Sequence, residues 1–224
     1  MIILPRLYAI VDAGMFTAAA DPVFALTSYV GELLAGGVTL IQYRDKSDNA
    51  RRMLAAAREL RRAAGAQELP QGSCRVRLIM NDRADLCLAA DFDGLHVGQD
   101  DLSPVAARTI VGPDKWLGVS THNPEQVCEA NQCPADYIAV GPVFETGSKA
   151  NPDPAIGLDG VRRARALTAK PLVAIGGITR ENCAGVIAAG ADAVAVISDL
   201  AKEPRRGARE FLARLNCVAR TQGV

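Results

Sequence analysis

The chain has 224 residues, of which 49% are hydrophobic and 22% charged, so it has enough apolar material to build a sizeable core. Its 25 basic and 25 acidic residues leave a formal net charge of zero, which argues against a nucleic-acid or membrane-surface protein that relies on a large basic field. Any binding site for an anion must therefore be local.

Short apolar runs recur along the whole chain and predict eight strands. They lie at 7–12, 39–44, 77–82, 94–97, 116–120, 137–144, 172–177 and 193–198. Between most of them, stretches rich in alanine and leucine have the spacing of amphipathic helices. These predicted helices lie at 50–64, 124–132, 159–169, 180–190 and 209–220.

The alternation of apolar strands and helices predicts the fold class. Strands that are apolar throughout favour a parallel sheet covered by helices, and eight strand–helix units in about 220 residues fit one closed (β/α)8 TIM barrel over residues 1–224. An open doubly wound sheet is the alternative. The first strand is followed by AGMF and not by a G-x-G-x-x-G turn, which counts against a dinucleotide fold. The stretch at 64–73 is predicted to be a loop where a helix leads into a strand.

The segment QYRDK at 42–46 ends the second predicted strand. Successive side chains of a strand point to opposite faces, so Gln42, Arg44 and Lys46 should share one face. In a barrel, reactive groups gather at the carboxyl ends of the strands, where these cations would form an electropositive wall. The alternative is a frayed strand end with solvated side chains.

Polar residues also follow the third and fourth predicted strands. They are Asn81, Asp82 and Arg83 after the third, and Gln99, Asp100 and Asp101 after the fourth. Neighbouring strand ends would bring Asp82 close to Asp100 or Asp101, and two carboxylates beside a phosphate-bearing ligand make a Mg²⁺ site. The alternative is that these aspartates only cap the helices that follow.

The remaining strand ends carry groups suited to an anion. They are Ser120, Thr121 and His122; Thr146, Ser148 and Lys149 in FETGSK; the glycines of AIGGIT at 174–179; and Ser198 of AVIS. Barrels often bind phosphate after the seventh and eighth strands, where small residues let backbone N–H groups approach the oxygens. We favour phosphate binding there over a tight turn alone for Gly176 and Gly177.

The histidines and cysteines indicate no further chemistry. His96 lies within a strand, as a satisfied core residue would, and His122 has no nucleophile nearby in sequence, so neither is assigned a catalytic role. The six cysteines form no C-x-x-C pair and are expected to be mostly small buried hydrophobes. No secretory signal or membrane-spanning run is found, which predicts a cytoplasmic protein without a membrane partner.

Seven motifs, taken in order, resemble the thiamine phosphate synthase family, also called thiamine-phosphate pyrophosphorylase. They are QYRDK, MNDR, DGLHVGQDD, GVSTH, DYIAVGPVFETGSK, PLVAIGGI and GADAVAVIS. The resemblance implies a Mg²⁺-dependent transferase of thiamine biosynthesis. Its substrates would be 4-amino-2-methyl-5-pyrimidinylmethyl diphosphate and 4-methyl-5-(2-phosphoethyl)thiazole, and its products thiamine monophosphate and pyrophosphate.

The resemblance also implies roles for individual residues. The pyrimidine diphosphate would be held by Gln42, Tyr43, Arg44, Asp45, Lys46, Asn81, Ser120 and Lys149. Mg²⁺ would be bound by Asp82 and Asp101, and the thiazole phosphate by Thr146, Ser148, Gly177, Ile197 and Ser198. The diphosphate would leave early from a cation-like pyrimidine methylene, so that no general base is needed and Arg44, Lys46 and Lys149 assist as catalytic cations.

Two departures and two rival functions bear on this interpretation. Tyr43 stands where the family usually has Leu, and Ser148 where it usually has a second Thr. Related thiazole tautomerases of the same fold can use a histidine at the position of His122 but usually lack parts of the diphosphate and metal set, which looks complete here. The other rival is a non-catalytic sensor that binds the thiazole phosphate, in which Asp82 and Asp101 would have no role. A homo-oligomer is compatible with the sequence.

Overall fold

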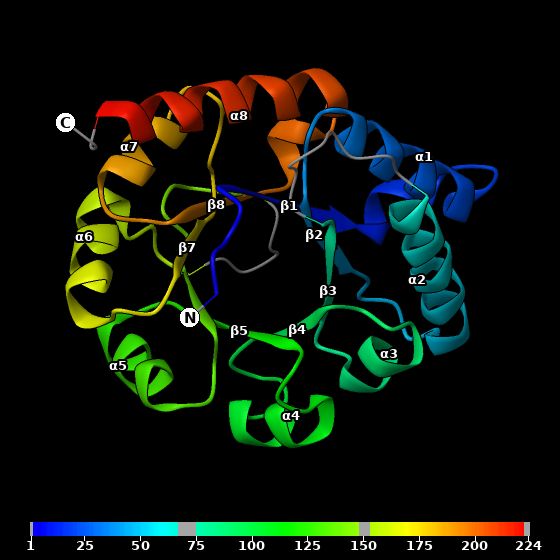
Figure 1. Ribbon diagram of the computed structural model, residues 1–224, viewed down its shortest axis with the longest axis horizontal. Helices are drawn as coiled ribbons and strands as arrows, with labels where there is room; N and C mark the ends of the chain where they lie inside the picture. The colour runs from blue at the N-terminus through cyan, green and yellow to red at the C-terminus, as the bar shows by residue number, and fades with distance from the viewer. Residues whose placement is uncertain (1, 67–74, 148–152, 222–224) are drawn as a thin grey trace.

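The computed structural model describes residues 2–66, 75–147 and 153–221 and is a closed barrel of eight parallel strands (Figure 1). The strands are β1 (Leu7–Asp12), β2 (Leu40–Arg44), β3 (Arg77–Asn81), β4 (Gly94–Val97), β5 (Trp116–Thr121), β6 (Tyr137–Val140), β7 (Leu172–Ile175) and β8 (Ala193–Val196). Each strand pairs with the next in sequence, and β8 closes on β1 through the register Tyr8–Ala195. The predicted (β/α)8 fold is confirmed.

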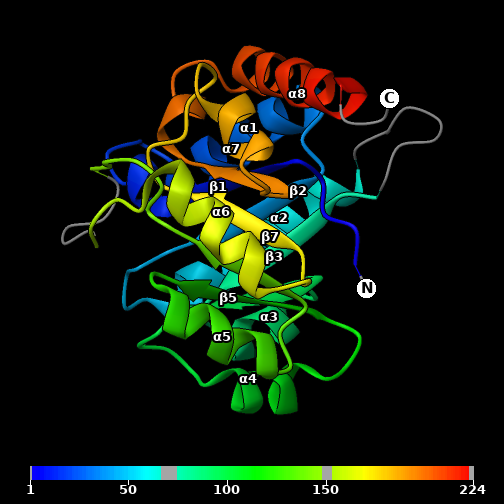
Figure 2. The same cartoon turned by 90° about the vertical axis from the view of Figure 1, so that its left-hand side faces the viewer.

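Helices form a ring outside the strands, as Figures 1 and 2 show. They are α1 (Pro22–Ala35), α2 (Ala50–Gly65), α3 (Ala84–Ala89), α4 (Pro104–Val111), α5 (Pro124–Gln132), α6 (Gly157–Leu167), α7 (Cys183–Ala188) and α8 (Pro204–Thr221), with two 3₁₀ helices, η1 (Ala13–Phe16) and η2 (Ser198–Leu200). Among the described residues, none of these helices is both long and apolar enough to cross a membrane.

The sequence analysis missed three helices, α1, α3 and α4. The sequence does carry a start signal for α1, since Asp21 accepts hydrogen bonds from the N–H groups of Val23 and Phe24 and Pro22 occupies the first turn. Helix α3 has only six residues, too few turns to show a helical period. The loop predicted at 64–73 lies largely outside the described residues.

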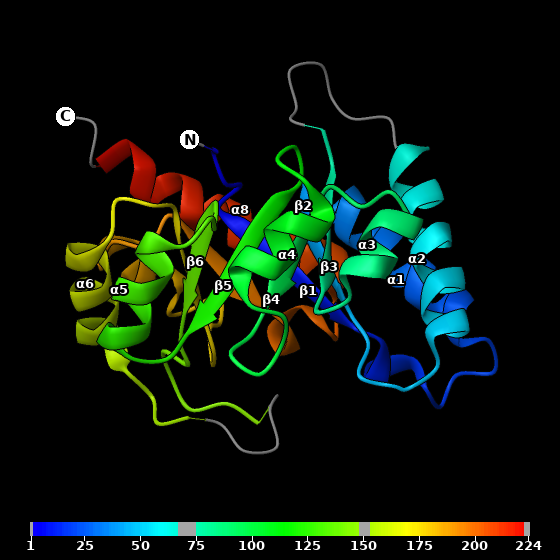
Figure 3. The same ribbon diagram turned by 90° about the horizontal axis from the view of Figure 1, so that it is seen from below.

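Four strands end earlier than predicted. Strand β3 stops one residue early at Asn81, and β6, β7 and β8 stop at Val140, Ile175 and Val196, after which the chain leaves the sheet. After β6, Pro142 has no N–H to offer a sheet, and after β7 the positive φ angles of Gly176 and Gly177 (98° and 61°) turn the chain away. These loops stand at the carboxyl end of the barrel, at the lower edge of Figure 3, while the last turns of α8 lie toward the upper edge.

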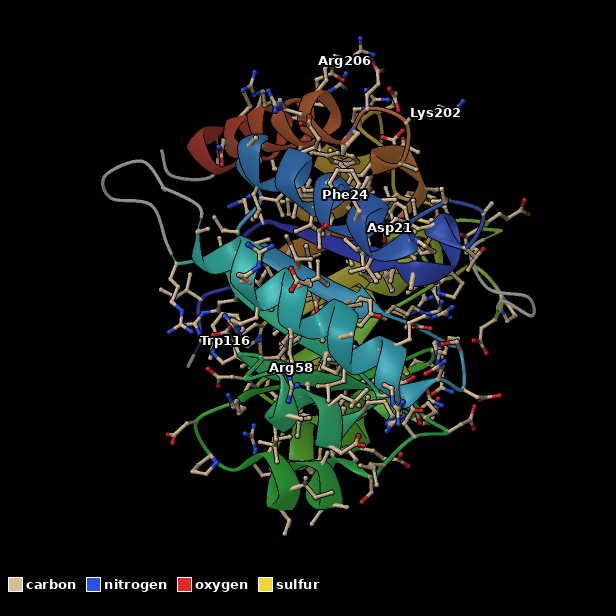
Figure 4. All side chains as sticks on the ribbon, turned by 90° about the vertical axis from the view of Figure 1, so that its right-hand side faces the viewer. Asp21, Phe24, Arg58, Trp116, Lys202 and Arg206 are labelled. Carbon is tan, nitrogen blue, oxygen red and sulfur yellow. The ribbon has the colours of Figure 1, made fainter. Side chains whose placement is uncertain are left out.

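The strands divide their side chains between two cores. One fills the barrel and includes Tyr8, Leu40, Ile79, Tyr137 and Val173, and the other lies between the strands and the helices. The helices follow the same rule: Met53 and Leu60 of α2 are buried, while Arg58 of the same helix is exposed and labelled on the outer surface in Figure 4.

A repeated ion pair closes the amino end of the barrel. Three aspartates, each directly before an even-numbered strand, accept a hydrogen bond from the backbone N–H of a leucine on the preceding strand. Each also pairs with an arginine of the helix that comes before that preceding strand, namely α2, α4 or α6. We call them the amino-end clamps: Asp93 with Leu78 (2.9 Å) and Arg61 (2.8 Å), Asp136 with Leu117 (2.8 Å) and Arg108 (2.6 Å), and Asp192 with Leu172 (2.7 Å) and Arg165 (2.9 Å). Every carboxylate in the clamps is therefore matched by donors within the fold.

Candidate active site

A cavity of about 510 Å³ opens at the carboxyl end of the barrel. It brings together most of the site residues named from the sequence. These are Gln42, Arg44, Lys46, Asn81, Asp82, Asp101, Ser120, Thr146, Gly177, Ile197 and Ser198, and His122 and Asp100 also line it. Ser148 and Lys149 lie outside the described residues.

The end of β2 places alternate side chains in the cavity, as its period of two predicts. Gln42 is 3% exposed and lies deepest, followed by Arg44 and Lys46 toward the mouth. The Arg44 guanidinium pairs with Asp12 at the end of β1, and Lys46 Nζ lies 2.5 Å from Asp82 Oδ2 at the end of β3. The strand end is therefore an ordered cationic wall, and the frayed-end alternative does not hold for Gln42 or Arg44.

Tyr43 and Asp45 do not line the cavity, so the expectation that their side chains contact substrate needs correction. Side chains alternate between the two faces of a strand, so Tyr43 points outward where Gln42 points inward. The Tyr43 side chain is 1% exposed and packs in the core between the strands and the helices. Its hydroxyl donates to Asp45 Oδ2 at 3.1 Å, and Asp45 Oδ1 accepts from the Ser47 N–H at 2.8 Å. Burial and the neighbouring Asp45 carboxylate raise the pKa of Tyr43, so it remains neutral and structural.

Asp82 and Asp101 converge at the mouth, as their neighbouring strands predict. Burial raises the pKa of Asp82, and the adjacent Asp101 carboxyl raises it further, more than the Lys46 ammonium lowers it. Asp82 also has a positive φ of 61°, a conformation that Asp adopts more readily than most residues. Asp101 Oδ2 accepts from the Gly98 N–H at 2.8 Å and, together with Asp100, remains exposed to solvent.

The surroundings of these two carboxylates suit a hard cation. Asn81 donates to Asp82 Oδ1 at 2.7 Å, while its own Oδ1 is buried and has no hydrogen-bond partner within the described part of the chain. An amide oxygen and two carboxylates are ligand types that Mg²⁺ accepts, usually with waters and substrate phosphates completing its shell. The described residues contain no cluster of three or more His, Cys, Asp or Glu side chains arranged around one metal position.

The floor of the cavity holds a connected row of polar side chains, and the sequence analysis did not foresee that they meet. Gln42 Nε2 lies 2.9 Å from the Tyr8 hydroxyl, which lies 3.0 Å from the Tyr137 hydroxyl. The Tyr137 hydroxyl is 3.1 Å from His96 Nδ1, and His96 Nε2 is 2.9 Å from Ser120 Oγ. We call these five residues the interior chain. The signal for it was tyrosine at inward-facing positions of the apolar runs LYAIVD and YIAV.

Burial lowers the pKa of His96 to about 4, so its ring is neutral at physiological pH. Both of its ring nitrogens have partners in the interior chain, which agrees with its interpretation as a satisfied core residue. His96 and His122 both line the cavity. The Nδ1 of His122 donates to the Gly141 carbonyl at 2.6 Å and lies 3.6 Å from Asp153 Oδ2.

The two glycines after β7 have a packing role besides their place in the cavity wall. A Cβ on Gly177 would lie 2.5 Å from the Glu145 carbonyl and 2.7 Å from Phe144 Cβ, and one on Gly176 would lie 2.5 Å from Pro142 Cβ. Both glycines are therefore required by the turn whether or not phosphate binds there, and a Gly177→Val change would displace the β6 loop and could not test phosphate binding by itself.

The helix predicted at 180–190 begins at Cys183, six residues after Gly177. Asn182 holds the intervening loop, because its Oδ1 accepts from the Thr179 N–H at 2.8 Å and its Nδ2 donates to the Gly177 carbonyl at 3.0 Å. Ser198 begins the short η2, whose Asp199 pairs with Arg180 at 3.0 Å. The cavity wall here is thus made of loop backbone and the Ser198 side chain.

Comparisons with known proteins agree with this site. A family model described as thiamine monophosphate synthase matches residues 7–200. A thiamine-phosphate synthase of Koribacter versatilis is 60% identical over 93% of this chain and 95% of that protein, and one of Chloroflexus aurantiacus is 42% identical over 86% and 83%. The solved structure of a thiamine phosphate pyrophosphorylase from Pyrococcus furiosus superposes with a TM-score of 0.80 at 31% identity, covering 95% of this chain and 96% of that one.

Proposed function

Because the chain belongs to the thiamine monophosphate synthase family and is therefore a transferase enzyme, we propose that it joins 4-amino-2-methyl-5-pyrimidinylmethyl diphosphate to 4-methyl-5-(2-phosphoethyl)thiazole. The products are thiamine monophosphate and pyrophosphate. The observation that carries the proposal is the convergence of Arg44, Lys46, Asp82 and Asp101 at the mouth of one cavity. Two cations beside two carboxylates suit a diphosphate that arrives with a divalent cation.

Asp82 and Asp101 are the residues that would hold Mg²⁺, with the buried Asn81 Oδ1 as a neighbouring oxygen. The raised pKa of Asp82 supports this assignment, because two adjacent carboxylates with no cation between them disfavour each other's ionisation. Bound there, Mg²⁺ would supply charge neutralisation for the diphosphate. Lys46, which forms an ion pair with Asp82, would neutralise part of the charge on the diphosphate.

The reaction needs one bond to break and one to form. The bond between the pyrimidine methylene and the diphosphate oxygen breaks, and its electron pair leaves with the diphosphate. The thiazole nitrogen then donates its lone pair to the cation-like methylene, and no proton has to be removed from that nitrogen. Arg44 and Lys46 counter the charge that grows on the leaving group, so positioning and electrostatics supply the catalysis. Lys149 is proposed as a third cation.

The two substrates would occupy different walls. The pyrimidine diphosphate would lie against β2, β3 and β5, with Gln42, Asn81 and Ser120 around the ring and the first phosphate. The thiazole phosphate would lie against the loops after β6, β7 and β8. The residues proposed to hold it are Thr146, Ser148, Gly177, Ile197 and Ser198, four of which line the cavity. This division leaves the thiazole nitrogen facing the methylene across the barrel mouth.

The test is release of pyrophosphate from both substrates, with Mg²⁺ present and with Mg²⁺ replaced by a chelator. We expect release only with both substrates and the metal, together with a product of the mass of thiamine monophosphate. A protein that binds the thiazole phosphate but never releases pyrophosphate would be the non-catalytic sensor. The location of His122 in the cavity makes a thiazole tautomerase the second candidate, and isomerisation of a thiazole substrate without the pyrimidine or Mg²⁺ would favour it.

A further inference from the structure

The interior chain connects two walls of the cavity through the middle of the barrel. It begins at Gln42 on β2, passes Tyr8 on β1, Tyr137 on β6 and His96 on β4, and ends at Ser120 on β5. Gln42, Tyr8, His96 and Ser120 all line the cavity, and Gln42 and Ser120 lie near the proposed pyrimidine position, whereas Tyr137 lies behind the cavity wall. Tyr8, Tyr137 and His96 have no role in the bond-making steps described above, yet each is at least 94% buried. In a buried network of this kind each hydrogen bond constrains the next, so the groups at its ends are held in a defined orientation.

The donors and acceptors in this chain fix its direction. The Gln42 amide N–H can only donate, so the Tyr8 oxygen accepts. If Tyr137 also donated to Tyr8, the Tyr8 hydrogen would have no acceptor in the interior chain and would point into the cavity, which Tyr8 lines. The arrangement in which each hydroxyl hydrogen has an acceptor within the interior chain has Tyr8 donating to Tyr137 and Tyr137 donating to His96 Nδ1.

The same donor-to-acceptor order continues across the two ring nitrogens of His96. A neutral imidazole carries one hydrogen, so an accepting Nδ1 places that hydrogen on Nε2. His96 Nε2 donates to Ser120 Oγ, which leaves the Ser120 hydrogen to point away from His96. The opposite direction would turn the Ser120 hydrogen back onto His96 and would leave the cavity facing only a lone pair.

We propose that Tyr8, Tyr137 and His96 are positioning residues that carry one hydrogen-bond direction across the barrel and so present the Ser120 hydroxyl as a donor to the pyrimidine substrate. At the other end, the Gln42 side chain is held by its N–H, which leaves its carbonyl oxygen as the acceptor. One substrate ring would thus meet an acceptor on one wall and a donor on the other. The identity of that ring rests on the proposed function, whereas the direction of the chain does not.

The packing around Tyr137 supports a built arrangement. A Cβ on Gly118 of β5 would lie 2.1 Å from Tyr137 Cζ and 2.4 Å from its hydroxyl oxygen, so glycine at 118 is what allows the ring to cross β5 and reach His96. The Tyr8 and Tyr137 rings meet edge to face with centroids 6.2 Å apart. Neither hydroxyl can move far without losing both of its partners.

The first test reads the histidine tautomers by ¹⁵N NMR of the unsubstituted, substrate-free protein at neutral pH. The chain has two histidines, and a His122→Asn sample identifies which signals belong to His96. We expect His96 to carry its hydrogen on Nε2. His122 should carry its hydrogen on Nδ1, because that nitrogen donates to the Gly141 carbonyl, and so serves as an internal reference of opposite tautomer. A hydrogen on Nδ1 of His96 would overturn the proposal.

The second test separates positioning from general stability. Tyr137→Phe breaks the chain while keeping the ring, and it should raise the KM for the pyrimidine diphosphate about 10-fold, as expected for one lost hydrogen bond. The KM for the thiazole phosphate should stay within about twofold, since that substrate does not meet Ser120. The matched control is Tyr29→Phe, a buried tyrosine that packs on Phe16 outside the barrel, which should change neither KM.

The outcomes of the two tests are distinct. Equal increases in both KM values for Tyr137→Phe would mark a merely structural role and overturn the proposal. If the protein releases no pyrophosphate at all, the proposed function fails, and the tautomer measurement still decides the direction of the chain. The tautomer measurement also stands if Tyr137→Phe does not fold, because it uses the unsubstituted protein.

Discussion

The two ends of the barrel use the same residue types in opposite ways. At the amino end, each clamp aspartate accepts from a backbone N–H and an arginine, so its charge is matched within the fold. At the carboxyl end, Asp82 lies beside Asp101, and its pKa is raised by burial and by that neighbour. The difference indicates that the amino end is built for stability and the carboxyl end to receive charge from a ligand.

The same contrast appears in the cations. Arg61, Arg108 and Arg165 of the clamps bridge helix to strand, and their positions are fixed by the fold alone. Lys46 is 53% exposed on its side chain although it pairs with Asp82. An exposed ion pair of this kind contributes little to stability. We therefore expect the Lys46–Asp82 pair to serve ligand binding. Substitutions at the two ends should therefore separate activity from stability.

The largest effect is expected at the carboxyl end. Asp101→Asn keeps an acceptor for the Gly98 N–H but removes the charge, and it should lower turnover by about 100-fold with the unfolding free energy nearly unchanged. Steady-state pyrophosphate release at saturating Mg²⁺ measures it. Asp100→Asn is the matched control and should be far milder, because we assign the ligand role to Asp101. Equal losses in the two variants would contradict that assignment.

The next largest effect is expected at the amino end, where a substitution should lower stability and leave turnover unchanged. Asp93→Ala removes the acceptor for the Leu78 N–H and leaves Arg61 and Arg75 without their carboxylate, so it should lower the unfolding free energy by about 3 kcal/mol. Turnover of the folded fraction should stay near that of the parent. Urea unfolding measures the first quantity and initial rates the second.

The control for this substitution is Glu59→Ala, which breaks an exposed pair with Arg62 and should cost less than about 0.5 kcal/mol. If Asp93→Ala abolished turnover in protein that is still folded, the two ends would not be independent, and the comparison that opens this Discussion would be wrong.

A smaller change in turnover should follow at β2. Arg44→Ala should lower turnover by about 30-fold, because a charge-assisted contact to the leaving diphosphate is lost as its charge grows. Arg44→Lys should restore only part, since lysine keeps the charge but loses the planar fork that grips two oxygens. Rates at saturating substrates decide this, and near-parental turnover in Arg44→Ala would show that the Arg44 charge does not act on the leaving diphosphate.

The smallest effect concerns the pH dependence of stability. Because the folded pKa of Asp82 is raised, the folded protein holds this proton to a higher pH than the unfolded chain. The favourable contribution of protonated Asp82 is present below the unfolded pKa of about 3.9 and is lost as the pH rises through the folded pKa. Asp82→Asn, which tolerates the positive φ, should then be slightly more stable than the parent at neutral pH without divalent cations.

That gain should shrink toward acidic pH, where Asp82 of the parent is protonated as well. Chemical unfolding with a chelator at several pH values measures both quantities. A variant that is less stable than the parent at neutral pH would show that the Lys46 pair, and not the repulsion from Asp101, dominates the environment of Asp82.

The sequence by itself determined the barrel and the composition of its mouth. Periodicity can be read from neighbouring residues alone, so the eight apolar runs and the alternation of side chains in QYRDK were enough to place Gln42, Arg44 and Lys46 on one face. The same alternation places Tyr43 on the opposite face and excludes its side chain from the cavity, but Tyr43 was assigned to the site from the family resemblance. Short helices such as α3 escaped because six residues carry too little periodic signal.

Only the tertiary structure decided which polar groups meet. The Tyr8 and Tyr137 hydroxyls are 129 residues apart in sequence and 3.0 Å apart in space, and no local pattern encodes that contact. Likewise, Gly118 is explained by a ring from another strand, and Gly177 by the carbonyl of Glu145 in the neighbouring loop. The physical reason is that hydrogen bonds and close packing depend on distances of a few tenths of an ångström, which barrel closure sets between segments that carry no information about each other.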